Sequence, residues 1–123
     1  MIKKILIVDD SPVSRKMLKS CIPKEPEYDI VEAGDGLAGF ELYKETQPDL
    51  TFMDLTMPVM DGIESLQEIL KFNQDAVVIV LTADIQLKSV TNALDVGAYL
   101  VLKKPATKNS IQEAISKAEE SMR

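Results

Sequence analysis

The feature that most constrains the fold of this chain is a regular alternation of short apolar runs with longer amphipathic stretches. The apolar runs are rich in Val, Ile and Leu and occupy residues 3–8, 28–32, 49–53, 76–81 and 99–102. The run at 76–81 has no polar member, which is typical of a strand that is covered on both faces. The alternation therefore predicts a βα-repeating domain with a parallel sheet.

The amphipathic stretches carry the signals of helices. Helices are expected from Ser11-Pro12 to a stop before Pro23, at 36–46, at 62–71, at 86–96, and from a Thr107 cap after Pro105. Gly97 suits the end of the fourth helix. Apolar positions at helical spacing are expected to face the core: Val13, Met17, Leu18 and Cys21; Leu37, Phe40 and Tyr43; Ile63, Leu66, Ile69 and Leu70; Leu87, Val90 and Leu94; Ile111, Ala114, Ile115 and Ala118.

Composition narrows the possible classes of protein. The 123 residues are enough for one domain with its own core, and no linker or repeat divides residues 1–123. A net charge of −6 argues against a nucleic-acid surface, and no apolar run is long enough to span a bilayer. Two acids end the short apolar start early, which argues against a secretory signal. The single cysteine, Cys21, fits a reducing cytoplasm, and the absence of histidine removes imidazole chemistry.

Charged side chains follow three of the expected strands. Asp9-Asp10 comes after the first apolar run, Asp54 after the third, and Lys103-Lys104 after the fifth. The carboxyl ends of parallel strands open onto one crevice, so these groups are expected to meet there. Two like charges about 4 Å apart repel by roughly 1 kcal/mol in water and roughly 4 kcal/mol at an effective dielectric near 20. A divalent cation together with a lysine would offset that repulsion.

These groups also share a chemistry. Mg2+ prefers oxygen ligands in near-octahedral geometry, and Asp9, Asp10 and Asp54 offer such oxygens. A carboxylate left over is a possible nucleophile toward phosphorus, with the metal and a lysine neutralising the transferred oxygens. Thr82, after the fourth apolar run, would place a hydroxyl beside the transferred group. Four strand ends that each supply a suitable group are a stronger signal than any one of them.

Each of these residues also has a purely structural interpretation. Asp9-Asp10 can cap the first helix, since acids at a helix start are favourable by roughly 0.3–1 kcal/mol. Thr82 can cap the fourth helix, Asp61 can be a turn residue, and Asp54 can be an ordinary acid at a strand end. The segment Met57-Pro58-Val59-Met60-Asp61-Gly62 argues against that last interpretation.

Taken in order, these residues resemble the receiver domain of two-component response regulators over essentially the whole chain. The matching motifs are Asp9-Asp10, Asp54, Met57-Pro58-Val59-Met60-Asp61-Gly62, Thr82-Ala83 and Lys104-Pro105, in family order and spacing. The resemblance is to a stand-alone receiver of the chemotaxis or sporulation type. It implies an α/β fold with a single-domain, doubly wound, flavodoxin-like parallel sheet of five strands in the order 2-1-3-4-5 and five helices.

The resemblance implies a role for each acid. Asp54 would be the phosphoacceptor. Asp10, Asp54 and the backbone carbonyl of Thr56 would hold Mg2+, while Asp9 would act largely through bound water. Thr56 and Asp84 flank the phosphorylation site in the family pattern and would modulate how easily water reaches the acyl phosphate.

Two further residues complete the implied switch. Lys104 would pair with the phosphoryl group, and Thr82 would move toward it. Lys104 is preferred to Lys103 because the family lysine directly precedes a proline, commonly through a cis bond. The family aromatic three positions before that lysine is replaced by Val101, with Tyr99 two residues earlier. Because valine is stiff at χ1, Val101 is not expected to make the inward rotation of the family aromatic.

The implied function is a phosphorylatable signalling domain and not an enzyme. A histidine kinase or phosphotransfer protein would donate the phosphoryl group, with no direct nucleic-acid contact and no membrane insertion. A downstream protein would bind the face made by the fourth helix, fifth strand and fifth helix, and the domain would be a monomer or a phosphorylation-dependent dimer. Two alternatives remain open. An aspartyl-nucleophile phosphatase wants acids two apart, where this chain has Asp9 and Asp10 adjacent, and a flavodoxin-like FMN carrier wants a phosphate-binding first loop, which here is acidic.

Overall fold

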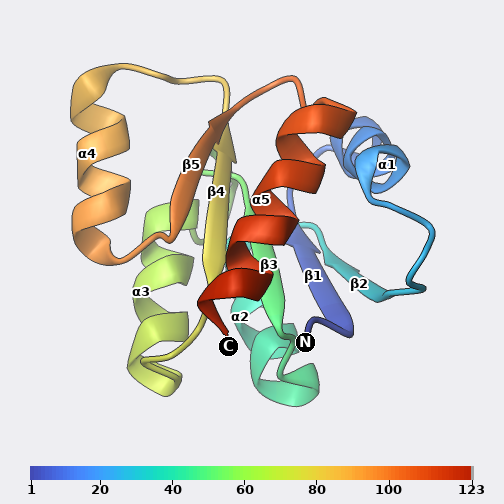
Figure 1. Cartoon of the computed structure of the whole chain (residues 1–123). Coiled ribbons are helices and arrows are strands. Elements are labelled where there is room, and N and C mark those ends of the chain that lie inside the picture. Colours follow the sequence, from blue (N-terminus) through green and yellow to red (C-terminus); the bar gives the residue numbers. More distant parts are fainter. Residues whose placement is uncertain (123) are drawn as a thin grey trace.

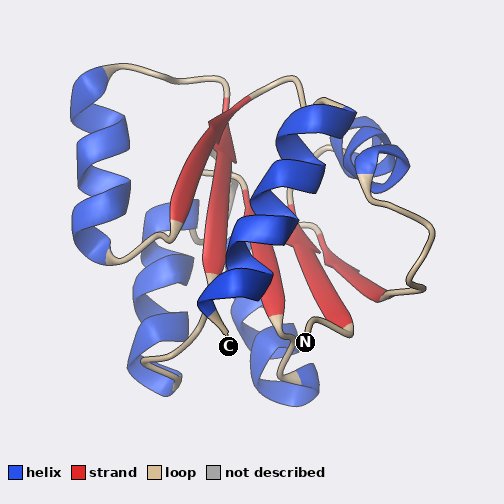
Figure 2. Ribbon diagram, in the orientation of Figure 1, coloured by secondary structure: helices blue, strands red, loops and turns tan. Residues whose placement is uncertain are grey.

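The computed structural model describes residues 1–122, which form five strands alternating with five helices (Figures 1 and 2). The elements are β1 (Lys4–Val8), α1 (Pro12–Cys21), β2 (Asp29–Ala33), α2 (Gly36–Thr46), β3 (Leu50–Met53), α3 (Gly62–Phe72), β4 (Val78–Thr82), α4 (Leu87–Val96), β5 (Leu100–Lys103) and α5 (Lys108–Ser121). The strands pair in parallel in the order β2-β1-β3-β4-β5. The expected doubly wound, flavodoxin-like α/β fold is confirmed.

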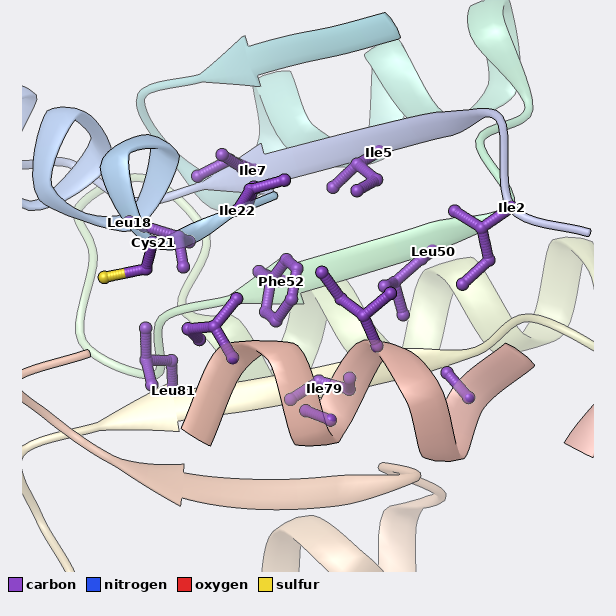
Figure 3. Packing of buried hydrophobic residues seen from close by; sticks show 14 residues of the cluster. Ile2, Ile5, Ile7, Leu18, Cys21, Ile22, Leu50, Phe52, Ile79 and Leu81 are labelled. Carbon is purple, nitrogen blue, oxygen red and sulfur yellow. The ribbon is translucent and has the colours of Figure 1, made fainter. Parts of the chain in front are cut away.

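The helices cover both faces of the sheet. α1 and α5 pack on one face, and α2, α3 and α4 pack on the other; α5 crosses in front of the sheet in Figure 1. Figure 3 shows Phe52 in the cluster on the α1–α5 face, and the strand register pairs it with Ile7 of β1 and Ile79 of β4. Because successive side chains on a strand point to opposite faces, Leu6 and Val8 pack into the other cluster. Full burial of one such side chain contributes about 1.5–3 kcal/mol.

The apolar stripe predicted for α1 is half right. Leu18 and Cys21 are buried, and Figure 3 shows them close together in the cluster. Val13, however, is 71% exposed, and Met17 is also exposed. The buried stripe follows the i, i+3 line through Leu18 and Cys21, so the C-terminal half of α1 is the part that enters the core. In α2, Leu37 is likewise exposed.

Two of the three core positions predicted for α4 are wrong. Leu87 is 80% exposed and Leu94 is exposed as well, whereas Val90 is partly buried and Ala93 is the fully buried residue of this helix. The physical reason is position: α4 packs against the edge strand β5 and against α3, so only a narrow strip of the helix is covered. By contrast, the stripe predicted for α5 is confirmed in full, with Ile111, Ala114, Ile115 and Ala118 all buried.

Side-chain caps set where several helices begin. Ser11 caps α1, so Asp9 and Asp10 are not its capping residues. Asp61 caps α3, and Thr107 caps α5 in a capping box, as the sequence predicts for Thr107. Gly97 ends α4 at a φ of 129°, a conformation that glycine adopts without steric cost.

Candidate functional site

Three acids gather at the carboxyl edge of the sheet. Asp9 follows β1 and Asp54 follows β3, and these strands are neighbours with Val8 paired to Met53. One carboxylate oxygen from each of Asp9, Asp10 and Asp54 lies within 4.8 Å of the others. The predicted convergence is therefore confirmed, and a cluster made only of oxygen ligands suits a hard cation such as Mg2+.

Asp9 is held through both its backbone and its carboxylate. Its N–H donates to the Ala33 carbonyl at 3.1 Å, and its carbonyl accepts from Arg15 Nη1 at 2.5 Å. Asp9 Oδ1 accepts from the Ser11 N–H at 2.9 Å, and Oδ2 accepts from Lys104 Nζ at 2.8 Å. The side chain is buried, so these contacts set its direction and neutralise its charge.

The carboxylate of Asp54 accepts fewer hydrogen bonds than that of Asp9. Asp54 is 8% exposed, and its Oδ1 accepts from the Leu55 N–H at 3.0 Å and lies 3.4 Å from Lys104 Nζ. Its Oδ2 accepts no hydrogen bond from residues 1–122, and the neighbouring Asp10 is exposed. The crevice thus presents one oxygen of Asp54 together with the carboxylate of Asp10.

Asp54 and Lys104 influence each other's ionisation. Burial raises the pKa of Asp54 above its ordinary value of 3.8, and the charge of Asp9 adds to this, while Lys104 partly offsets it. Burial acts to lower the pKa of Lys104, but its hydrogen bond to Asp9 and the charges of Asp54 and Asp9 outweigh burial and raise it above 10.5. Lys104 is therefore firmly cationic, and Asp54 is a desolvated carboxylate that a further cation would stabilise.

Only one of the two adjacent lysines lies in the crevice. Lys104 contacts Asp9 and Asp54, whereas Lys103 is exposed. The Lys104–Pro105 peptide bond is cis, as the resemblance to the receiver family leads one to expect. The choice of Lys104 over Lys103 agrees with this geometry.

Close backbone approach fixes the loop between β3 and α3. A Cβ on Gly62 would lie 2.0 Å from the Asp54 carbonyl oxygen, so only glycine allows α3 to start this close to the acid. The Gly62 N–H donates to the Leu55 carbonyl at 2.9 Å. Between them, Val59 has a φ of 69° and Met60 N–H donates to the Pro58 carbonyl at 2.8 Å, which forms a tight turn beside the crevice.

Thr82 is the last residue of β4 and is buried. Its hydroxyl accepts from the Asp84 N–H at 3.0 Å. Helix α4 begins only at Leu87 and has no side-chain cap, so Thr82 does not cap it. The Asp84 carboxylate accepts from the Gln86 N–H at 3.1 Å and from the Ser89 hydroxyl at 2.7 Å, and these bonds lower its pKa.

The remaining candidate residues lie around this centre. Thr56 is exposed in the loop after Asp54, and Val101 is half-buried in β5. Tyr99 is partly exposed, and its hydroxyl donates to the Lys117 carbonyl at 3.0 Å. Sequence reasoning missed Arg15, whose guanidinium reaches the Asp9 carbonyl. Its position one helical turn beyond the Ser11 cap is the only signal that the sequence carries for this contact.

The fold and the acidic crevice define a phosphoacceptor module. The chain matches the response regulator receiver domain family over residues 5–116, and it belongs to that family. Such domains are the phosphorylatable modules of two-component signalling and not catalytic enzymes, so the aspartyl phosphatase and the FMN carrier are set aside.

Individual relatives sharpen this assignment. Chemotaxis proteins CheY from Halobacterium salinarum and Thermotoga maritima are each 40% identical to this chain, with 94% of this chain and 96% of each relative covered. A CheY from Borrelia burgdorferi, crystallised in a complex with CheX, BeF3 and magnesium, is 30% identical with a TM-score of 0.87. That comparison covers 94% of this chain and 87% of the other. Within residues 1–122, no helix has the length and apolar character needed to cross a membrane.

Proposed function

We propose that Asp54 accepts the phosphoryl group and that Asp10, Asp54 and the backbone carbonyl of Thr56 hold Mg2+, with Asp9 acting through bound water. The observation that carries the proposal is that the carboxylates of Asp9 and Asp54 differ in their hydrogen bonding. Both oxygens of Asp9 already accept hydrogen bonds, whereas Asp54 Oδ2, next to the exposed Asp10, accepts none from the described residues 1–122. Lys104 neutralises the opposite side of the same carboxylate.

In the transfer, an oxygen of Asp54 attacks the phosphorus of a phosphohistidine on a kinase or phosphotransfer protein. The new O–P bond forms as the N–P bond breaks, and the departing imidazole takes a proton from solvent. Bound Mg2+ supplies positive charge that stabilises the transferred oxygens. The Lys104 ammonium adds charge from the side of β5, and the Thr82 hydroxyl donates to the phosphoryl group.

The movement of Thr82 connects the crevice to α4. Its hydroxyl accepts from Asp84 N–H, and the Asp84 carboxylate accepts from Ser89 in α4. Reorientation of Thr82 toward a phosphoryl group therefore changes the loop that leads into α4. Val101 replaces the usual aromatic and is too stiff for an inward rotation, so the β4–α4 loop carries the response. Asp84 and Thr56 modulate how readily water reaches the acyl phosphate.

In this proposal, residues 1–123 form a single domain. It passes the signal on by binding a downstream protein noncovalently. The face formed by α4, β5 and α5 is supported as the contact surface by three exposed apolar side chains, Leu87, Leu94 and Tyr99. The domain works in the cytoplasm beside its kinase, as a monomer or as a dimer that forms on phosphorylation.

The test is phosphorylation from a small donor. With acetyl phosphate and Mg2+, the intact protein should gain one phosphoryl mass, and Asp54→Asn should gain none. Asp61→Asn is the matched control, because asparagine also caps a helix and the charge change is identical. A parent protein whose mass stays constant, or an Asp54→Asn variant that is still modified, would contradict the proposal.

A further inference from the structure

Arg15 joins the acidic turn to the neighbouring strand. Its Nη1 donates to the backbone carbonyl of Asp9 at 2.5 Å, while its Nε donates to Glu32 Oε1 at 3.0 Å. Glu32 belongs to β2, where it pairs with Ile7 of β1. The guanidinium side chain is only 20% exposed. One side chain from α1 thus bridges β2 and the loop that follows β1.

The carbonyl that Arg15 holds belongs to the peptide unit between Asp9 and Asp10. A peptide unit is planar, so fixing its carbonyl oxygen fixes the orientation of the whole plane. That plane places the Cα of Asp10, and the bond from the Ser11 N–H to Asp9 Oδ1 holds the peptide unit that follows, so the two contacts together set the direction in which the Asp10 side chain leaves the backbone. Asp10 itself is exposed, so burial does not hold its carboxylate in place, and its direction depends on the backbone that Arg15 holds.

Glu32 holds the guanidinium in place, and its other carboxylate oxygen accepts from Lys19. Glu32 Oε1 accepts from Arg15, and Glu32 Oε2 accepts from Lys19 Nζ at 2.7 Å. The hydrogen bond from Lys19 is the main cause that lowers the pKa of Glu32, with Arg15 contributing in the same direction. Because Arg carries several donors in a rigid planar fork, it can make both bonds at once, which a lysine cannot do with the same geometry.

We propose that Arg15 is a positioning residue for the Mg2+ site: it fixes the Asp9–Asp10 peptide so that the Asp10 carboxylate is directed toward Asp54 before the metal binds. This inference rests on the proposed function. Residues that orient metal ligands typically change metal affinity by about 10- to 100-fold when they are replaced.

Charge and geometry make opposite predictions for this residue. By charge alone, removing a cation beside three carboxylates should strengthen Mg2+ binding. By positioning, removing the donor to the Asp9 carbonyl should weaken it. Arg15→Gln therefore separates a positioning role from a merely electrostatic one.

The experiment titrates Mg2+ alone into the full chain and follows binding by calorimetry and by the amide signals of Asp10 and Asp54. We expect about tenfold weaker binding for Arg15→Gln. Lys19→Gln is the matched control, because it removes the same charge and contacts the same Glu32 without touching Asp9. It should bind Mg2+ as tightly as the parent or more tightly.

Two further measurements distinguish a loss of positioning from a folding defect in the variant. Arg15→Lys keeps the charge but not the fork, so it too should weaken binding while thermal unfolding shows an intact domain. In acetyl phosphate reactions, Arg15→Gln should raise the Mg2+ concentration for half-maximal rate and leave the plateau rate close to that of the parent.

The outcomes are distinguishable from failure of the proposed function. If the parent binds Mg2+ and is phosphorylated but a folded Arg15→Gln binds as tightly as the parent or more tightly, the positioning role is wrong and Arg15 only ties α1 to β2. If the parent itself binds no Mg2+ and gains no phosphoryl mass, the proposed function fails first.

Discussion

Asp54 lies where three influences on one carboxylate compete. It is desolvated by burial, repelled by Asp9 and attracted by Lys104, and the net result is a raised pKa. Desolvation is the largest of these influences, so the charged site is held by the fold at a cost in stability. The same features make the carboxylate responsive to any added positive charge.

This balance predicts a pH-dependent effect of Asp54→Asn on stability. Because the folded pKa lies above the ordinary 3.8, the folded protein binds more protons than the unfolded chain in that interval. The free energy of unfolding therefore falls as pH rises through the interval. Without Mg2+ at neutral pH, Asp54→Asn should be more stable than the parent, with the difference shrinking below pH 3.8. Urea unfolding at both pH values tests this, and a variant less stable than the parent at neutral pH would contradict it.

At the scale of elements, the β3–α3 connection decides where the phosphoacceptor lies. Gly62 brings the first turn of α3 against the Asp54 carbonyl, and Gly36 brings α2 equally close to the loop, because a Cβ there would lie 1.9 Å from the Met60 carbonyl oxygen. Two helix starts and one strand end therefore share a space that has no room for an added methyl group.

Gly62→Ala tests this packing. The added Cβ would overlap backbone atoms, which cannot rotate away, so α3 must shift at a cost of roughly 3 kcal/mol. Urea unfolding should show that loss, and Mg2+ binding should weaken because Asp54 moves. Gly34→Ala is the control, since its Cβ would meet only Arg15 Nη1 at 3.7 Å, an ordinary contact. Equal stability of the two variants would show that the loop is not tightly packed.

At the scale of the whole molecule, a chain of hydrogen bonds leads from the crevice to a distant helix. Thr82 accepts from Asp84, and Asp84 accepts from Ser89 in the first turn of α4. Helix α4 lies at the edge of the sheet and buries little, so it can move at low cost (Figure 1).

Beryllofluoride with Mg2+ should reveal this path by mapping amide signals over the entire domain. We expect changes to extend from Asp54 through Thr82 and Asp84 to Ser89, with smaller changes at Val101. Thr82→Ala removes the hydroxyl and should confine the changes to the crevice. If the parent already shows changes only in the crevice, the hydrogen-bonded path does not transmit the signal.

Much of the fold can be predicted from the sequence because the signals for strands, helix caps and helix ends are local. The apolar runs, the cap at Thr107 and the stop at Gly97 each depend on neighbours within a few residues, and all match the structure. The convergence of Asp9 and Asp54 follows from topology, since both come directly after neighbouring parallel strands. Helix faces were less predictable: Val13 and Leu87 have helical spacing, but spacing alone does not say which side of a helix meets the sheet.

By itself, then, the sequence determined the succession of strands and helices and the acids, threonine and lysine that follow the strands, because hydrophobic period, caps and turns are short-range properties. Only the tertiary structure decided that Lys104 reaches Oδ2 of Asp9, that Arg15 reaches the Asp9 carbonyl from α1, and that α4 exposes its leucines. Those outcomes depend on the rotation and placement of helices on the sheet, and packing between residues far apart in the chain sets both.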